Sequence, residues 1–364
     1  MPPDTHSHSP PADLPRYQPD QTYEWNYSHA PDPVAFEVPE LPGDWTYAGL
    51  PVASPLAIAA GPLLNGRWLL YYASLGFDVL TYKTVRSRHR PSYPLPNLQP
   101  VDAPRLTGDD TELPAADTPS GSWAVSFGMP SREPDIWRAD VESIRRQLSP
   151  GKLLSVSVVA TPDSDWTTEQ LAADFAQCAR WAVESGADCV EANFSCPNVA
   201  SADGQLHQQP ESAGLVARII RDTIGATPFL IKLGHVPEPD LAGRLIDALA
   251  PHADALVMVN CIPARVRAND GTALFNGESR GIAGDAIRSA CLEQIRCFTG
   301  LIRERQLKLR VIGVGGISTA EHVNQFLSAG CEAVQLATAA MLDPTVALRL
   351  RAVLQSSESP GSRD

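Results

Sequence analysis

Residues 310–340 read RVIGVGGISTAEHVNQFLSAGCEAVQLATAA and hold one complete unit of the pattern that fills most of the chain. A short apolar run, 310–314, leads through two glycines into an amphipathic stretch, and a second apolar run follows at 333–337. Short apolar runs that alternate with amphipathic stretches indicate buried parallel strands covered by helices. This unit therefore predicts an α/β fold.

The same alternation extends back to about Leu50 and gives eight candidate strands. They are 56–60, 79–83, 153–159, 189–194, 229–233, 255–260, 310–314 and 333–337, and the helical stretches include 68–74, 168–185, 213–224, 238–250, 285–304 and 319–329. Within 285–304 an apolar stripe recurs every three or four residues, at Ile287, Cys291, Ile295, Phe298 and Ile302. Eight such units predict a (β/α)8 TIM barrel. An open doubly wound sheet is the alternative, although no GxGxxG follows the first strand.

The chain divides into three regions. Residues 1–45 are Pro-rich and aperiodic, which predicts an extended N-terminal arm that packs in part through its aromatic residues. The barrel is expected over 46–355, followed by a disordered C-terminal tail at 356–364. Long loops after strands 2 and 6, at 85–122 and 262–281, are expected to be functional lids or disordered. Both follow strand C-termini, the catalytic end of such a barrel.

Composition excludes several classes of function. The chain has 29 Lys and Arg against 42 Asp and Glu, a net charge of −13, which argues against a nucleic-acid groove or an anionic membrane surface. No run approaches the roughly 18 apolar residues that span a bilayer, and no secretory signal is visible, so a cytoplasmic protein is expected. The seven cysteines are scattered without a CxxC, which suggests neither disulfides nor a metal site.

Polar side chains cluster where the predicted strands end. Lys83 closes the second strand, Asn193 the fourth, Lys232 the fifth and Asn260 the sixth. Each alone could cap a helix or satisfy a loop. Together, two lysines and two asparagines at one barrel mouth predict an anionic or carbonyl-rich ligand.

The segment 190–198, VEANFSCPN, places Asn193, Cys196 and Asn198 within six residues. A thiol on such a loop can act as a general base if its pKa is lowered, and the carboxamides can hold amide or carboxylate groups of a ring. The alternative is a buried cysteine in a tight turn. The polar stretch that follows, 199–214, predicts a mobile lid that excludes water.

A phosphate site is predicted after the last two strands. GVGGIS at 313–318 and LATAA at 336–340 each lead into a helix, and barrels often bind a phosphate there. Gly281 and Gly284, in RGIAG, could add backbone donors. For Gly315 and Gly316 a tight strand-to-helix turn is the alternative.

These residues resemble the dihydroorotate dehydrogenase family over roughly 51–344. The motifs that carry the resemblance are AAG at 59–61, YKT at 82–84 with PLPNL after it, NFSCPN at 193–198, IKLG at 231–234, VNC at 259–261, GIAG at 281–284, GVGG at 313–316 and VQLATA at 334–339. The resemblance implies a barrel that binds FMN and an enzyme that acts on a CH–CH bond, oxidising (S)-dihydroorotate to orotate. A proton passes to Cys196 and a hydride to the flavin, and cysteine at this position is typical of the soluble class 1 enzymes of pyrimidine biosynthesis.

The resemblance also assigns the other site residues. Asn193, Asn198 and Asn260 are implied to bind substrate, Lys83 to lie between flavin and substrate, and Lys232 to lie near the flavin pyrimidine ring, where a positive charge favours the reduced flavin. Flavin contacts are implied for Ala60, Gly61 and Thr84, and phosphate contacts for Gly315, Gly316, Ala337 and Thr338.

Three features depart from the family. AVSFGMPS at 124–131 puts Val125 where the family carries a substrate-binding asparagine, Cys261 replaces a Ser or Thr, and the loop 262–281, with Arg265, Arg267 and Asp270, is long. A lost hydrogen-bonding partner changes ligand choice. The alternatives are therefore a dihydropyrimidine or other ene-type oxidoreductase and, from another class, an aldolase or isomerase barrel with a Schiff base on Lys232 or Lys83.

The sequence leaves the partners open. The electron acceptor is expected to be a small soluble oxidant or a partner flavoprotein, because the arm does not read as the apolar helix pair of the membrane-bound class. Barrels of this kind often dimerise, so a homodimer is considered.

Overall fold

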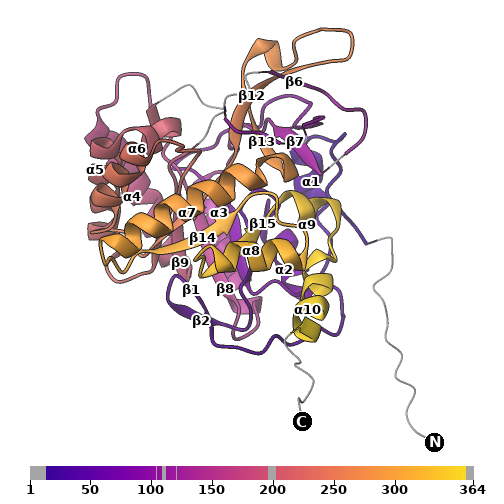
Figure 1. Ribbon diagram of the computed structural model, residues 1–364, viewed down its shortest axis with the longest axis horizontal. Helices are drawn as coiled ribbons and strands as arrows, with labels where there is room; N and C mark the ends of the chain where they lie inside the picture. The colour runs from indigo at the N-terminus through magenta and orange to yellow at the C-terminus, as the bar shows by residue number, and fades with distance from the viewer. Residues whose placement is uncertain (1–13, 104, 109–111, 120, 196–201, 358–364) are drawn as a thin grey trace, which may run out of the picture.

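Eight parallel strands close into a barrel in the computed structural model, which describes residues 14–357 except 104, 109–111, 120 and 196–201 (Figure 1). Around the barrel the order is β3-β4-β8-β9-β10-β11-β14-β15, with every pair parallel. The strands are β3 Leu56–Ile58, β4 Val79–Val85, β8 Leu153–Val158, β9 Cys189–Asn193, β10 Phe229–Lys232, β11 Ala255–Met258, β14 Arg310–Val314 and β15 Ala333–Leu336. The predicted TIM barrel is confirmed, and the ends of the predicted strands are within two residues of those observed.

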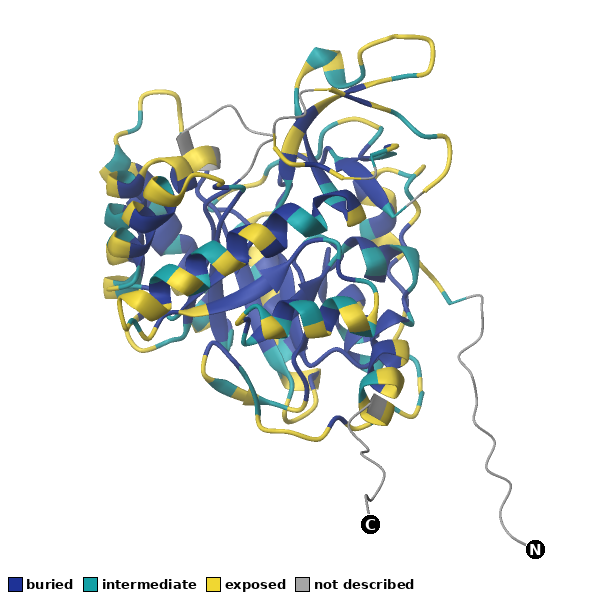
Figure 2. Ribbon diagram, in the orientation of Figure 1, coloured by how far each residue is buried: buried dark blue, intermediate teal, exposed yellow. Residues whose placement is uncertain are grey.

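Helices surround the barrel and bury one face against it (Figure 2). They are α2 Gly66–Ser74, α3 Pro134–Gln147, α4 Thr168–Glu184, α5 Pro210–Ile224, α6 Pro239–Leu249, α7 Arg288–Glu304, α8 Ala320–Ser328, α9 Thr338–Leu342 and α10 Val346–Ser357. The apolar stripe predicted within 285–304, which covers α7 and the residue before it, is buried at all five positions. No prediction covered α3, since only Trp137, Val141 and Ile144 are buried in an otherwise polar helix.

The two long loops form a second sheet beyond the strand C-termini. Its order is β5-β7-β13-β12-β6, from β5 Leu98–Pro100, β6 Glu112–Pro114, β7 Ser122–Val125, β12 Ile262–Arg267 and β13 Arg280–Gly284. The expectation of disorder at 85–122 and 262–281 is therefore wrong for the residues in these strands, whereas a role as functional lids stays a prediction. β12 alternates buried and exposed residues, and it pairs with β6, which is distant in sequence.

The arm lies against the barrel from Leu14 onward and includes the short helix α1 Tyr23–Ser28. Tyr17 and Tyr23 are buried, and the Tyr17 ring meets Phe127 edge-on at 6.0 Å between centroids. The hairpin of β1 Trp45–Tyr47 and β2 Leu50–Val52 follows, and its Tyr47 is fully buried within the barrel core. Across the described ranges, no helix is long and apolar enough to cross a membrane.

Candidate active site

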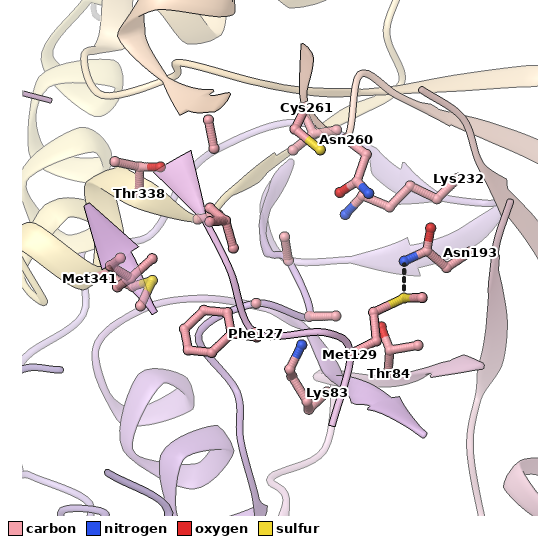
Figure 3. A pocket seen from close by; sticks show the side chains of 18 of the residues that line it. Lys83, Thr84, Phe127, Met129, Asn193, Lys232, Asn260, Cys261, Thr338 and Met341 are labelled. Atoms are coloured by element: carbon pink, nitrogen blue, oxygen red, sulfur yellow. Dashed lines mark hydrogen bonds between the residues drawn. The ribbon is translucent and has the colours of Figure 1, made fainter. Parts of the chain in front are cut away.

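The polar residues predicted at the strand ends line one cavity at the mouth of the barrel (Figure 3). Parallel strands point their carboxyl ends the same way, so side chains from β4, β9 and β10 and from just after β11 meet there. The predicted site residues that line this cavity are Ala60, Gly61, Lys83, Thr84, Asn193, Lys232, Asn260, Ala337 and Thr338. Lys83, Asn193 and Lys232 are each less than a tenth exposed, so their polar groups face the cavity rather than bulk water.

Apolar side chains complete the lining of the cavity. They come largely from the second sheet and the segment after β7: Leu98, Trp123, Val125, Phe127 and Met129, with Met341 from α9. The Lys83 ammonium lies 5.7 Å from the Phe127 ring centroid, a cation–π distance. A flat ring with a polar edge would match this lining of apolar side chains with a few polar groups among them.

A second cavity continues from the first through five shared residues, among them Asn260, Ala337 and Thr338. It is lined by Gly284, Gly315, Gly316 and Ser318. A Cβ on Gly284, at φ +99°, would lie 2.1 Å from the Gly121 carbonyl oxygen, and one on Gly316, at φ +71°, would lie 2.8 Å from the Gly284 carbonyl oxygen. Only glycines let these three backbone segments approach so closely, and the resulting cradle suits a phosphate ester.

Gly281 is placed differently from the other predicted cofactor residues. It does not line either cavity and pairs with Val125 across β13 and β7.

A buried polar network lies beneath Lys232, and sequence reasoning missed it. The Lys232 ammonium is 3.7 Å from a carboxylate oxygen of Glu191, which is fully buried, and 3.3 Å from Gln335 Oε1. Gln335 Nε2 donates to Glu191 at 2.7 Å and to the Tyr47 hydroxyl at 2.8 Å. The signal was one acidic residue within the apolar strand VEAN, because a carboxylate in such a strand requires a buried partner.

Asn193 and Asn260 both contact the backbone of Ser195. The Ser195 N–H donates to Asn193 Oδ1 at 3.1 Å, and Asn260 Nδ2 donates to the Ser195 carbonyl oxygen at 2.6 Å. Cys196 and Asn198, predicted as base and substrate ligand, lie outside the described residues.

The segment expected as a lid at 199–214 is helical in its described part except at Gln209, and 199–201 fall outside that part. The turn η1 Ala202–Gln208 leads into α5. The buried His207 ring lies with Nδ1 3.1 Å from the Phe194 carbonyl oxygen, and burial lowers its pKa below the ordinary value.

The departures from the family pattern differ in their position. Val125 and Cys261 line the cavity, whereas Arg265, Arg267 and Asp270 are not among its lining residues. Arg267 instead pairs with Glu112 across β12 and β6 at 2.6 Å. Only the first two departures can touch a ligand in this cavity.

Comparison with known proteins identifies the family. The model of the dihydroorotate dehydrogenase family matches residues 122–357. A dihydroorotate dehydrogenase from Dictyostelium discoideum is 30% identical over 323 residues, covering 83% of this chain and 86% of the relative. The catalytic subunit of dihydroorotate dehydrogenase B (NAD(+)) from Maridesulfovibrio salexigens is 32% identical over 171 residues, 46% of this chain and 53% of that protein.

The fold has a solved counterpart as well. A crystal structure of DHODH from Eimeria tenella in complex with ferulenol superposes with a TM-score of 0.71 at 17% identity, covering 92% of this chain and 89% of that one. At this identity the likeness concerns the fold alone. With the family model and the Dictyostelium relative, we conclude that the chain belongs to the dihydroorotate dehydrogenase family.

Proposed function

We propose that this chain is an FMN-dependent oxidoreductase that converts (S)-dihydroorotate to orotate. The observation that carries the proposal is the joining of a two-lysine, two-asparagine cavity to a glycine cradle. One part suits a small polar ring and the other a phosphate ester, as substrate and FMN require. Family membership supports the same reaction and is against a Schiff-base aldolase.

The residues present fit FMN. Gly284, Gly315, Gly316, Ala337 and Thr338 would hold its phosphate, and Ala60, Gly61, Thr84 and Lys232 would surround its ring system. Gly281 would act through the backbone of β13 rather than by contact. When bound, FMN supplies the hydride acceptor for the reaction.

The protein's own groups handle the substrate and the proton. In the proposed reaction the Cys196 thiolate removes one C–H proton, a hydride leaves the adjacent carbon, and a C=C bond forms between the two. Lys83, buried against Phe127, would hold the substrate carboxylate in a site where charge is poorly screened. Asn193, Asn198 and Asn260 would bind the amide groups of the ring.

An anaerobic absorbance spectrum before and after addition of dihydroorotate tests the proposal. A yellow protein that bleaches supports both cofactor and substrate. A yellow protein that stays oxidised would show that the flavin is bound but that the substrate is a ring other than dihydroorotate. A colourless protein that takes up no FMN, and that borohydride traps with a bound sugar phosphate, would favour the aldolase.

Val125 favours a second candidate, a dihydropyrimidine or other ene-type oxidoreductase. Its half-buried side chain lines the substrate cavity and can make no hydrogen bond. Under this second candidate, Val125→Asn should create or raise dihydroorotate turnover, by about tenfold for one recovered hydrogen bond. The matched change Val353→Asn, on the exposed surface of α10, should leave turnover unchanged. Equal turnover in wild type and Val125→Asn would count against the second candidate.

We further propose a cytoplasmic enzyme of pyrimidine biosynthesis that passes electrons to a small soluble oxidant or a partner flavoprotein. A homodimer is proposed because barrels of this kind often dimerise. Sedimentation of the purified protein tests the dimer, and reoxidation rates with candidate acceptors test the electron route.

A further inference from the structure

We propose that the Ser195 peptide group sets the orientation of both cavity asparagines, so that the site presents an N–H donor from Asn193 and a carbonyl acceptor from Asn260. This inference rests on the proposed function, since it concerns how that cavity selects its ring. It adds a positioning element, the backbone of Ser195, that does not itself need to touch the substrate.

The orientation follows from the chemistry of the peptide group. A backbone N–H can only donate, so the Asn193 atom that faces it at 3.1 Å must be the amide oxygen. A backbone carbonyl can only accept, so the Asn260 atom that faces it at 2.6 Å must be the amide nitrogen. Ser195 is 1% exposed, so water cannot readily replace either amide. Turning either amide over would set donor against donor or acceptor against acceptor.

The other end of each amide is therefore determined. Asn193 Nδ2 points at the Met129 sulfur at 3.6 Å, a weak acceptor that a ligand carbonyl would readily replace (Figure 3). Asn260 Oδ1 has no hydrogen-bond partner among the described residues, and Asn260 lines the same cavity. The site thus matches a ring with a carbonyl toward β9 and an N–H toward β11, as in a cyclic amide or imide. A ring with the reverse order must bind in another pose.

Isosteric and truncating variants of Asn193 separate the two ends of its amide. Asn193→Asp keeps the oxygen that accepts from Ser195 and removes the donor that faces the cavity, whereas Asn193→Ala removes both. The experiment uses the full-length protein with FMN added. Hydrogen exchange at Ser195, measured by mass spectrometry without substrate, reports on the bond to Asn193 Oδ1. Titration with orotate, measured by calorimetry, reports on Asn193 Nδ2, which faces the cavity.

For Asn193→Asp we expect exchange at Ser195 close to wild type, together with an orotate dissociation constant raised at least about tenfold. Asn193→Ala should raise both the exchange rate at Ser195 and the orotate dissociation constant. Asn260→Asp should speed exchange at Ser195, because a carboxylate oxygen would then face the Ser195 carbonyl oxygen to which the amide of Asn260 now donates. The aspartate still offers an acceptor to the ring. The exposed Asn324→Asp on α8 is the control and should change neither quantity.

Two results would overturn the inference. One is exchange at Ser195 as fast in Asn193→Asp as in Asn193→Ala, and the other is unchanged orotate affinity in Asn193→Asp. If the wild-type protein binds no orotate, the proposed substrate fails, but the exchange comparison still decides whether Ser195 holds the amides.

Discussion

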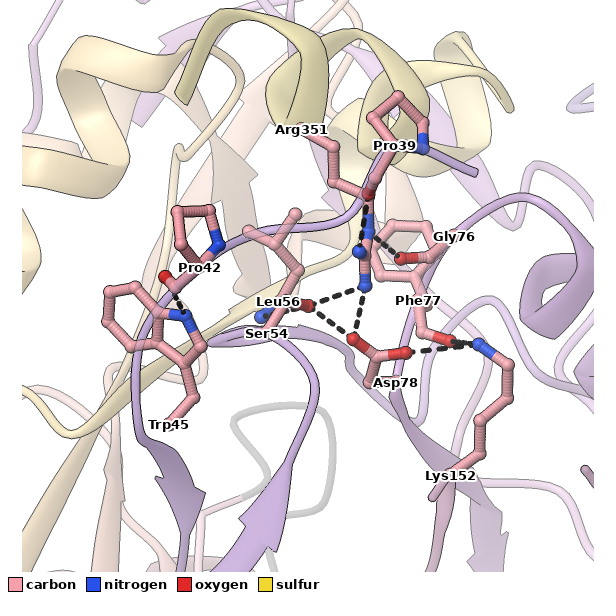
Figure 4. Close-up of polar contacts among 10 residues, drawn as sticks. All are labelled: Pro39, Pro42, Trp45, Ser54, Leu56, Gly76, Phe77, Asp78, Lys152 and Arg351. Carbon is pink, nitrogen blue, oxygen red and sulfur yellow. Dashed lines mark hydrogen bonds and ion pairs between the residues drawn. The ribbon is translucent and has the colours of Figure 1, made fainter. Parts of the chain in front are cut away.

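Asp78→Asn should destabilise the protein substantially while leaving the cofactor site intact. Asp78 directly precedes β4, at the end of the barrel opposite the site, and its carboxylate is 5% exposed. It accepts from Lys152 Nζ at 3.1 Å, from the Ser54 hydroxyl and from Arg351 of α10 (Figure 4). Arg351 is 3% exposed and also donates to the carbonyl oxygens of Gly76 and Pro39. The cluster therefore ties α10 and the arm to the barrel floor.

The magnitude follows from what the substitution leaves behind. Asparagine has nearly the volume of aspartate, so no cavity forms, but two cations lose their shared carboxylate. Burial lowers the Arg351 pKa and Asp78 opposes that effect, so removing Asp78 leaves the guanidinium's burial uncompensated. Breaking a buried pair in this way costs about 3–5 kcal/mol, and we take about 3 because Lys152 is partly exposed and Arg351 keeps its carbonyl partners. With an unfolding entropy of about 2.1 cal/mol/K per residue over 364 residues, that corresponds to a Tm lower by roughly 4 °C.

Thermal and urea denaturation of the FMN-loaded protein at pH 7 measure this loss. The matched control is Asp32→Asn, which breaks the exposed pair with Arg67 and should cost less than about 1 kcal/mol. A free energy of unfolding for Asp78→Asn within about 1 kcal/mol of wild type would refute the reasoning. A weakened FMN affinity at 25 °C would also refute it, because the network would then not be confined to the floor.

Cys196→Ala should leave FMN bound and slow flavin reduction by about two to four orders of magnitude in anaerobic stopped-flow, whereas the half-buried Cys297→Ala should not; full turnover would place the base elsewhere. Gly284→Ala should raise the FMN dissociation constant at least about tenfold in fluorescence titration, since its Cβ would lie 2.1 Å from a backbone oxygen, while Gly300→Ala meets open space and should bind FMN normally. Burial lowers the pKa of His207, so the unfolded chain takes up a proton at a higher pH than the folded protein does. The contribution of His207 to stability is therefore complete above about pH 6.5 and is lost as the pH falls toward the pKa of the folded state. His207→Gln should flatten that part of the urea-midpoint profile, and an unchanged slope would assign it to other groups.

Much of the barrel could be predicted because its information is local. Apolar runs of five to seven residues, separated by amphipathic stretches, locate strands and helices without any knowledge of what packs against them. Lys83, Asn193, Lys232 and Asn260 could be grouped in advance because closing a parallel barrel brings all strand ends to one face.

The contacts between distant segments were decided only by the tertiary structure. β6 pairs with β12 about 150 residues later, and Arg351 meets Asp78 across 273 positions. Likewise, the sequence shows Glu191 only as one acidic residue in an apolar strand, and its partners Lys232 and Gln335 come from β10 and β15. Local periodicity records which face of a segment is apolar, but it does not record which polar group another segment will supply. The sequence by itself identified the polar residues of the site, whereas closure of the barrel decided their hydrogen-bond partners.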